Sequence, residues 1–496
     1  MDRKAFLAAG LALPGALHAL ADTGGDSPAI SEAGRPRPAA RPRPEMAQGA
    51  DERFEELVRR VERQMREHSI PGAAFGVMKD GALQTRALGV TSIEDPRPVT
   101  TDTVFELASL SKIVTATAAM ALVQQGRLEL DAPVRRYLPS FRVQDESTSA
   151  SVTLRNLLTH ATGWEPRYAV EDGTGALGRW VATMGDLIQI APPGRVWSYD
   201  NTGFGLMGHL IEVETGLDFR DALQELVFTP IGLDRASTRL TEIVTWPVAL
   251  GHRPGPGGSA EVVRPYSMGS SIPAGGVNMS LASLMRFVAF HLGEHDAEGP
   301  FALTRATREA MRAPQLAKQP TTEQMGIGFH LRSLGGVRTA AHGGTAGAGH
   351  RCHLQLVPER RLGFAILTSH TEGWRLLQTV ERATLETYEG LALAADQPIC
   401  GYRGHTETLD HVTPLSAQPA PGEYVGRYRR GRDRMVEVRA APGGGLLIGD
   451  ADTPVLFYGS DVCFRSRGDR TNHEFIRDDG EVRWLRTGGQ IAVKEG

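Results

Sequence analysis

The sequence predicts an α+β protein whose antiparallel sheet is assembled from both ends of one long segment. A helix and two strands open this segment at residue 51, and four strands and a helix close it near residue 393. Between them, apolar residues recur mainly at helical spacing. Strands grouped at the ends, rather than alternating with helices, favour an antiparallel sheet flanked by helices. We therefore expect that sheet, an all-helical insert inside the segment, and a small C-terminal β-barrel after it.

The opening elements follow from apolar spacing and turn residues. A helix is expected to begin near Asp51 and to end at Pro71, because one apolar face runs between them. That face consists of Phe54, Leu57, Val58, Val61 and Met65. Residues 72–78 and 82–90 are expected to form two strands, joined by a hairpin turn at Lys79-Asp80-Gly81.

The closing elements follow a long apolar helix and the insert. That helix is expected over residues 109–125, where Gly126 ends it. Strands are expected over 327–331, 338–342, 350–357 and 362–368. A last helix over about 374–393 offers four candidate packing residues, which are Leu377, Val380, Ala383 and Leu385.

The chain divides into five segments. Residues 1–21 are typical of an export signal, with Arg3 and Lys4 before an apolar stretch and Ala19-Leu20-Ala21 as the cleavage site. Residues 22–50, rich in Pro, Ala and Arg, predict a disordered linker. Residues 51–395 form the main domain, 396–420 a second linker, and 421–496 a β domain of short alternating strands. We expect an exported protein, periplasmic or secreted, without a membrane-spanning segment.

The composition excludes several functions. A formal net charge of −4 provides no basic surface for a nucleic acid. Three cysteines are too few for a disulfide scaffold. A disulfide between Cys400 and Cys463 is one alternative, but three unpaired thiols, including Cys352, are favoured. A metal site is not expected, because on a strand His350 and Cys352 would face away from His353. No metal or cofactor is implied.

Ser109-Leu110-Ser111-Lys112 is the first group of residues that carries chemistry. Ser109 lies at the start of the apolar helix, where backbone N–H groups favour developing negative charge. Lys112 shares its face and can act as a base if burial lowers its pKa. An arginine could not do this, and the chain has only five lysines. The alternatives are a helix-capping Ser109 with a solvated Lys112, and Ser111 as the nucleophile.

Tyr199 and Asn201 form the second group, within the stretch Trp197–Gly203. A phenol can relay a proton, and an amide can hold a substrate or an amine. Taken alone, these residues favour a surface turn before a helix over 205–214, with Asp200 or Asn201 as the helix cap.

His342-Gly343-Gly344-Thr345 is the third group, and it follows an expected strand. The glycines allow a substrate to approach the backbone closely. The strand edge beside them can offer an N–H group to an oxyanion. The alternative is a glycine-rich hairpin with an incidental histidine.

The three groups, in this order and with a long gap before the third, resemble the serine β-lactamase and penicillin-binding protein superfamily. Their motif sequences are most similar to those of the class C-like members. Four further stretches support the resemblance: Phe105–Ala108, Gly126–Asp131, Leu154–His160 and Pro273–Gly276. The likeness spans about residues 52–393. The tail from Gly422 resembles the lipocalin-like β domain often appended to such hydrolases, which sometimes reaches the active-site mouth.

The resemblance implies a serine hydrolase that works through an acyl-enzyme. Ser109 would be the nucleophile, and Lys112 and Tyr199 would share the proton transfers. Asn201 would orient Lys112 and the substrate amide.

The resemblance also assigns the third group to substrate binding. The N–H groups of Ser109 and Thr345 would form the oxyanion hole, while His342 and Gly344 would orient the substrate. His342 fills the place where β-lactamases carry a lysine. Because a neutral histidine offers a β-lactam carboxylate only a hydrogen bond, efficient β-lactamase activity is not expected.

Several activities fit this pattern. We expect hydrolysis of esters, amides or D-amino-acid-containing peptides, with a small-molecule or peptide acyl substrate as the binding partner. The alternatives are acyl transfer to an amine, by a DD-transpeptidase or a penicillin-binding-protein-type peptide cyclase, and β-lactam hydrolysis. A non-catalytic binder of cell-wall peptide is the least favoured. No motif encodes the substrate or the oligomeric state.

Overall fold

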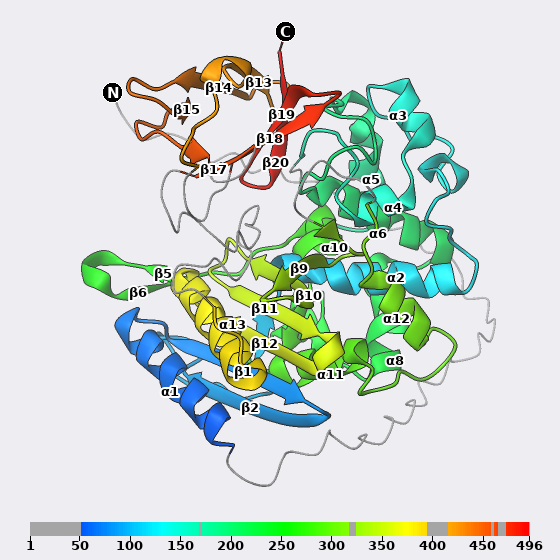
Figure 1. Ribbon diagram of the computed structural model, residues 1–496. Coiled ribbons are helices and arrows are strands. Elements are labelled where there is room, and N and C mark those ends of the chain that lie inside the picture. Colours follow the sequence, from blue (N-terminus) through cyan, green and yellow to red (C-terminus); the bar gives the residue numbers. More distant parts are fainter. Residues whose placement is uncertain are drawn as a thin grey trace, which may run out of the picture. The chain divides into compact units, whose positions relative to one another are not determined.

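Seven antiparallel strands form the central sheet, in the order β2-β1-β12-β11-β10-β9-β8 (Figure 1). The computed structural model describes residues 51–167, 171–316, 324–393, 415–457, 461–464 and 473–495, and all of them belong to the unit Arg43–Gly496. The two ends of the main segment meet where β1 pairs with β12, as expected. The strands are β1 (Gly72–Lys79), β2 (Ala82–Gly89), β8 (Gln324–Met325), β9 (His330–Leu334), β10 (Val337–Thr345), β11 (Arg351–Val357) and β12 (Leu362–Thr368).

The first helix and the first hairpin form as the spacing predicted. Helix α1 (Glu52–Glu67) begins after Asp51, whose side chain accepts a hydrogen bond from the Arg53 N–H. The five residues of its expected apolar face are all buried. Asp80 and Gly81 have φ angles of 51° and 84°, which a two-residue hairpin turn of this kind requires.

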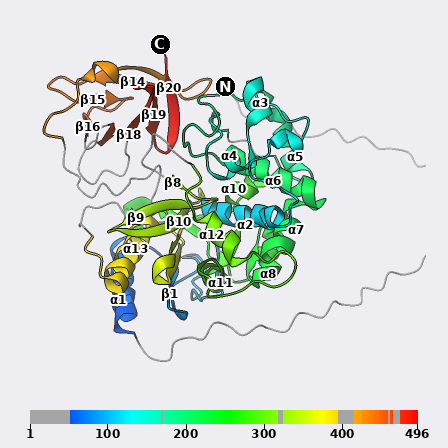
Figure 2. The ribbon, with the colours of Figure 1, turned by 45° about the vertical axis from the view of Figure 1, so that its right-hand side comes forward.

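Helices cover both faces of the sheet. Side chains alternate along β1, so Phe75 and Val77 pack with α1 and α13 (Trp374–Glu389), while Ala74 and Met78 pack in the core on the opposite face. Figures 1 and 2 show α1 and α13 side by side on one face. The core on the opposite face includes α2 (Ser111–Gln124) and α11 (Leu281–Leu292). The four expected packing residues of α13 are buried, which confirms that face.

The insert is mainly helical but contains short strands, so the expectation of an all-helical insert is wrong. Strands β3 (Val104–Glu106), β7 (Asn278–Ser280) and β4 (Ala236–Ser237) form a small sheet, and β5 (Gly251–Pro254) pairs with β6 (Ala260–Val263). Segments of two to four residues are too short to show an alternating pattern. The remaining helices are α3 (Glu146–Ser151), α4 (Leu154–Leu158), α5 (Ala176–Ala182), α6 (Asn201–Thr215), α7 (Phe219–Leu223), α8 (Thr229–Ile231), α9 (Leu240–Ile243), α10 (Ile272–Gly275) and α12 (Arg305–Met311).

Two strands of the central sheet differ from their expected bounds. The segment expected over 327–331 is interrupted because Gly328 has a φ of 75°, so β8 and β9 lie on either side of it. Strand β10 continues past His342 to Thr345, because the two glycines between them pair with β11. The glycine-rich motif is therefore part of the sheet and does not form a hairpin turn.

The C-terminal residues form a second antiparallel sheet, in the order β15-β14-β13-β20-β19-β18-β17-β16. Its edges meet, because Leu446 and Val455 exchange backbone hydrogen bonds of 2.8 and 3.3 Å. The sheet therefore curls into a small barrel, and the likeness to lipocalin-like domains stays a prediction. Its strands are β13 (Gly426–Arg429), β14 (Met435–Ala440), β15 (Leu446–Ile448), β16 (Leu456–Phe457), β17 (Val462–Phe464), β18 (His473–Asp478), β19 (Glu481–Thr487) and β20 (Gln490–Lys494).

Some expectations fall outside the described residues: the export signal at 1–21, the linker at 22–50, and residues 396–414 of the second linker, with Cys400. Cys352 is buried and is a free thiol.

Within the described ranges, no helix has both the length and the hydrophobicity to cross a membrane.

Candidate active site

The turn that carries Ser109 has a strained backbone. Ser109 lies in a short 3-10 helix, Ala108–Leu110, and α2 begins only at Ser111, which corrects the expected start of the α-helix at Ser109. Ala108 has a φ of 45°, in the left-handed region that residues with a side chain rarely adopt. Such a conformation costs roughly 1–3 kcal/mol and occurs preferentially at functional sites.

Ser109 lies in this 3-10 turn, and Lys112 lies three residues further on, in the first turn of α2. Leu110 is the N-cap of α2 and makes no side-chain cap, so the interpretation of Ser109 as a helix cap is wrong. Ser111 is fully buried, and its hydroxyl accepts the Val277 N–H at 2.9 Å. Ser111 is therefore unsuited to attack a substrate, whereas Ser109 is only half-buried.

Lys112 is completely buried, with 0% of its surface exposed. Its Nζ donates to the carbonyl oxygen of Ala274 at 2.8 Å and lies 4.8 Å from the ring centroid of Tyr199. Burial lowers the pKa of Lys112 to about 7, while the charge of Asp200 acts in the opposite direction. The interpretation as a solvated lysine is therefore wrong. A lysine with this pKa is substantially neutral at pH 7 and can accept a proton from a nearby hydroxyl.

Asp200 holds the segment that carries Tyr199. Its carboxylate accepts hydrogen bonds from the Thr162 hydroxyl at 2.9 Å and the Trp164 indole at 2.7 Å, and it caps α6 through two backbone N–H groups. Burial raises the pKa of Asp200, and these hydrogen bonds oppose the rise. Because Asp200 and Trp197 are buried, the segment is not the surface turn that its composition favoured.

Asn201 is the first residue of α6, which begins four residues earlier than expected. Its Oδ1 is buried and has no hydrogen-bond partner among the described residues. The Lys112 amine bonds to Ala274, so the orientation of Lys112 by Asn201 stays a prediction. A buried amide oxygen of this kind can accept an N–H group of a substrate amide.

His160 is a site residue to which the motifs assigned no role. It has a φ of 57° and is fully buried. Its ring stacks on Tyr199, with centroids 4.5 Å apart, and its Nδ1 accepts the Asp200 N–H at 2.9 Å. Burial holds the pKa of His160 well below its ordinary value, so the ring is neutral at pH 7. His160 therefore supports the Tyr199 ring without adding charge.

His342 lies on β10 with 3% of its surface exposed. A carbonyl oxygen can only accept, so the 2.6 Å contact to Gly343 O assigns the proton to Nδ1. Nε2 is then an acceptor, and it is buried without a hydrogen-bond partner in the described part of the chain. Burial holds the pKa of His342 well below its ordinary value. The neutral ring therefore presents a lone pair, which does not attract a carboxylate.

Gly344 and Thr345 bring β10 against the nucleophile turn. A Cβ atom on Gly344 would overlap the carbonyl oxygen of Leu107, so the missing side chain allows this approach. Ala346, next to Thr345, packs with Ala108. The protein itself occupies the space at Gly344, so a direct contact of Gly344 with substrate stays a prediction.

The C-terminal barrel contacts the Tyr199 segment. The backbone N–H of Tyr199 donates to the carbonyl oxygen of Gly489, between β19 and β20, at 2.7 Å. Trp484 of β19 donates its indole N–H to Ile190 O at 3.1 Å, inside an apolar cluster shared by the barrel and the main domain. The barrel therefore fixes one side of the segment that carries Tyr199.

Sequence reasoning missed three contributors to this site: His160, the carbonyl group of Ala274, and Gly489. His160 and Ala274 lie in stretches that supported the family resemblance, and that was the signal available for them. The Gly489 contact involves backbone atoms of segments far apart in the chain, so no motif predicts it.

The antiparallel sheet flanked by helices, with a serine and a buried lysine at the start of α2, defines a serine hydrolase of the type that includes β-lactamases and penicillin-binding proteins. The chain belongs to the Beta-lactamase family, whose model matches residues 57–388. This result confirms the resemblance inferred from the motifs.

The chain is similar to three proteins across different spans. It is 35% identical to penicillin-binding protein 4 of Amycolatopsis lactamdurans over 312 residues, covering 61% of this chain and 82% of that protein. It is 33% identical to esterase EstB of Burkholderia gladioli over 186 residues, covering 34% of this chain and 47% of that protein. The crystal structure of SurE matches with a TM-score of 0.73 and 26% identity, covering 90% of this chain and 99% of that chain.

The rate of acylation should follow the ionisation of Lys112. Only the neutral amine can take the Ser109 proton, so we expect the acylation rate constant to fall about tenfold per pH unit below pH 7 and to level off above about pH 8. Stopped-flow measurement of p-nitrophenol release from an ester between pH 5 and 9 checks this. A pH-independent rate would contradict a base with this pKa.

Trp484→Ala should lower kcat roughly 10–100-fold with little change in KM, because it loosens the barrel contact that positions Tyr199. Steady-state kinetics on a chromogenic ester measures both constants. Tyr428→Phe is the matched control, since it removes a 2.7 Å hydrogen bond to Tyr424 O inside the barrel and leaves the Tyr199 contact in place. An equal loss of kcat in both variants would indicate barrel instability and would contradict the positioning role.

Proposed function

We propose that the protein cleaves acyl substrates through a covalent acyl-enzyme on Ser109. The Ser109 hydroxyl gives its proton to the Lys112 amine as its oxygen attacks the acyl carbon. The proton then passes by way of Lys112 and Tyr199 to the leaving group, and water releases the acyl group in a second step. The observation that carries this proposal is the complete burial of Lys112, three residues from Ser109.

The oxyanion of each step is assigned to the backbone N–H groups of Ser109 and Thr345. The packing of β10 against Leu107 and Ala108 supports this assignment, because it brings the end of β10 to the turn that carries Ser109. Backbone donors of this kind stabilise the charge of a tetrahedral intermediate. Asn201, His342 and Gly344 are proposed to orient the substrate beside them.

The substrates proposed are esters, amides or D-amino-acid-containing peptides. The similarity to an esterase over 186 residues supports esters as one of these classes. β-Lactams are disfavoured, because the neutral His342 ring presents a lone pair where a substrate carboxylate would need a donor or a positive charge. Export is proposed from the pattern of residues 1–21, and a lipocalin-like origin is proposed for residues 421–496.

The nucleophile is tested by intact-protein mass spectrometry after brief incubation with a short-chain p-nitrophenyl ester. The wild type should gain one acyl group, and Ser109→Ala should gain none, with a loss of turnover of at least ~10³-fold. Ser111→Ala is the matched control, because Ser111 is buried and bonded to Val277, and it should still be acylated. Acylation of a folded Ser109→Ala variant would overturn the proposal.

A further inference from the structure

Two cavities lie beside β3, the strand that leads into the nucleophile turn. The larger has a volume of about 750 Å³ and the smaller about 520 Å³. They share four lining residues, which are Glu106, Leu240, Pro265 and Asn278. Glu106 and Asn278 face each other as register partners of β3 and β7. None of the three chemical motifs of the sequence accounts for these cavities.

The larger cavity is close to the reacting centre. Glu106 precedes Ser109 by three residues, so their Cα atoms are at most about 11 Å apart. Val263 and Ala348 line the cavity and pack in the same small cluster as Ala108, the residue before Ser109. The cavity wall therefore packs against the turn that carries Ser109.

Three hydrogen-bond acceptors gather in the wall of this cavity. The first is the carboxylate of Glu106. The second is His350 Nδ1, because His350 donates from Nε2 to Ala249 O at 3.1 Å, which leaves Nδ1 without a proton. This Nδ1 is buried, has no hydrogen-bond partner within the described ranges, and lies 3.9 Å from Glu106 Oε2. Asn278 donates through Nδ2 to Gly276 O at 3.2 Å, which leaves its Oδ1 as an acceptor. A primary ammonium group has three donors and one positive charge, so it matches this set.

The remainder of the cavity wall suits an aliphatic chain. Trp246, Val248 and Leu250 contribute apolar surface, together with Val263 and Ala348. Such walls favour methylene groups, while Glu106 supplies one negative charge at β3. The combination is complementary to an alkylammonium chain.

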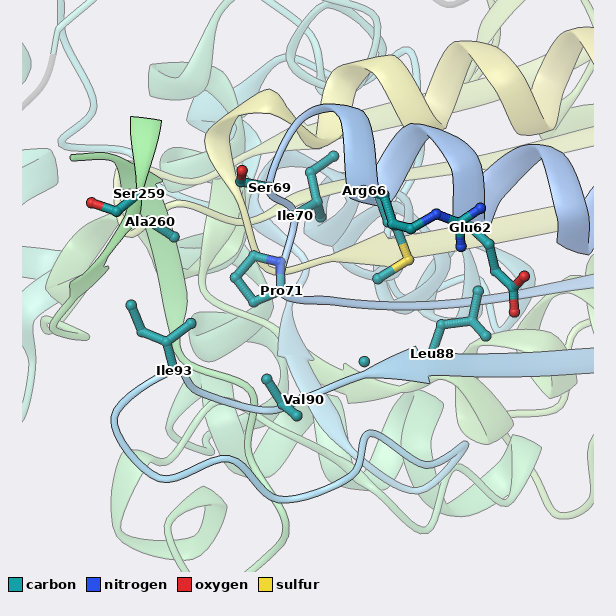
Figure 3. Close-up of a pocket in the computed structure, with 12 residues that line it drawn as sticks. Glu62, Arg66, Ser69, Ile70, Pro71, Leu88, Val90, Ile93, Ser259 and Ala260 are labelled. Atoms are coloured by element: carbon teal, nitrogen blue, oxygen red, sulfur yellow. The ribbon is translucent and has the colours of Figure 1, made fainter. Parts of the chain in front are cut away.

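A separate hollow of about 600 Å³ near the end of α1 offers no comparable chemistry. Figure 3 shows Ile70, Pro71, Leu88 and Val90 among its lining residues. Its charged residues, Glu62 and Arg66, are not buried, and no polar atom of its lining is buried and unpartnered. The cavity beside β3 is therefore the stronger candidate for a binding site.

We infer that the cavity lined by Glu106, Asn278 and His350 binds the primary ammonium group of an amine-bearing acyl donor. This inference rests on the proposed function, because it places the acyl group on Ser109. It deepens that function by selecting, among esters, amides and peptides, those whose acyl part carries an amine on an aliphatic chain.

The state of Glu106 makes this recognition dependent on pH. Burial raises the pKa of Glu106 to about 7, and the titratable groups that interact with it are His350, Tyr266 and Cys352. Other charged side chains also line the two cavities, which are Asp95 and Arg97 in the larger and Asp218, Arg220 and Arg239 in the smaller. Burial holds the pKa of His350 at about 4 and raises those of Tyr266 and Cys352, so these three stay neutral between pH 6 and 8. The affinity for an ammonium group should therefore rise from pH 6 to 8 as Glu106 ionises.

The test compares p-nitrophenyl 6-aminohexanoate with p-nitrophenyl heptanoate, which replaces the ammonium group with a methyl group of similar size. A second pair, 8-aminooctanoate and nonanoate, covers a longer reach. The wild type should favour the amine-bearing ester by about tenfold or more in kcat/KM for at least one pair. Glu106→Gln should remove most of that preference, measured as the ratio of the two substrates in the same variant.

Asp95→Asn is the matched control, because Asp95 lines the same cavity but is exposed and paired with Arg97. It should keep the wild-type ratio. A wild-type ratio near one for both pairs, or a ratio that survives in Glu106→Gln, would overturn the inference while leaving acylation of Ser109 intact.

If no ester acylates the protein, the proposed function fails instead. Calorimetry with n-hexylammonium then decides the inference: wild type, but not Glu106→Gln, should bind it, and binding should tighten from pH 6 to 8.

Discussion

The burial of Lys112 is the constraint on which the rest of the site depends. An ammonium group in water has a pKa near 10.5, and this environment lowers it to about 7, a difference on the order of 5 kcal/mol between charged and neutral forms. The surrounding core must offset that cost. It does so with α2, in which twelve consecutive residues from Ser111 to Leu122 are buried, and with one hydrogen bond to Ala274 O. Arginine could not take this place, because it stays protonated.

The buried groups around Lys112 are either neutral or fully hydrogen-bonded. His160 and His342 are buried and neutral, so they shape the site without competing for the proton. Asp200 follows Tyr199 in the chain, and backbone and side-chain donors satisfy its buried carboxylate. Tyr199 is held by the His160 ring on one side and by the Gly489 carbonyl oxygen through its backbone. The reacting groups are thus fixed by three parts of the chain that are distant in sequence.

The elements that form from residues close together in the sequence were predicted correctly. The apolar spacing predicted the buried face of α1, and the turn residues predicted the β1–β2 hairpin. Taken alone, the Tyr199 motif favoured a surface turn, and only the family resemblance implied that Ser109, Lys112, Tyr199 and His342 share one site. The structure places Lys112 Nζ 4.8 Å from the Tyr199 ring centroid, and the centroids of the Tyr199 and His342 rings 6.5 Å apart. The short strands of the insert and the contact from Gly489 were not predicted, since both depend on pairing between distant segments. The 3-10 turn at Ser109 was missed because Ala108 has a side chain, and composition gives no sign of its positive φ.

The direct test of this account is the pKa of Lys112, measured by NMR of protein labelled with ¹³C at the lysine Cε. The chain has only five lysines, so the spectrum is simple, and the Lys112→Arg variant assigns the signal by its disappearance. This signal should titrate near pH 7. A Lys112 signal that stays unchanged until pH 9 would show a charged amine at neutral pH and would contradict its role as the base.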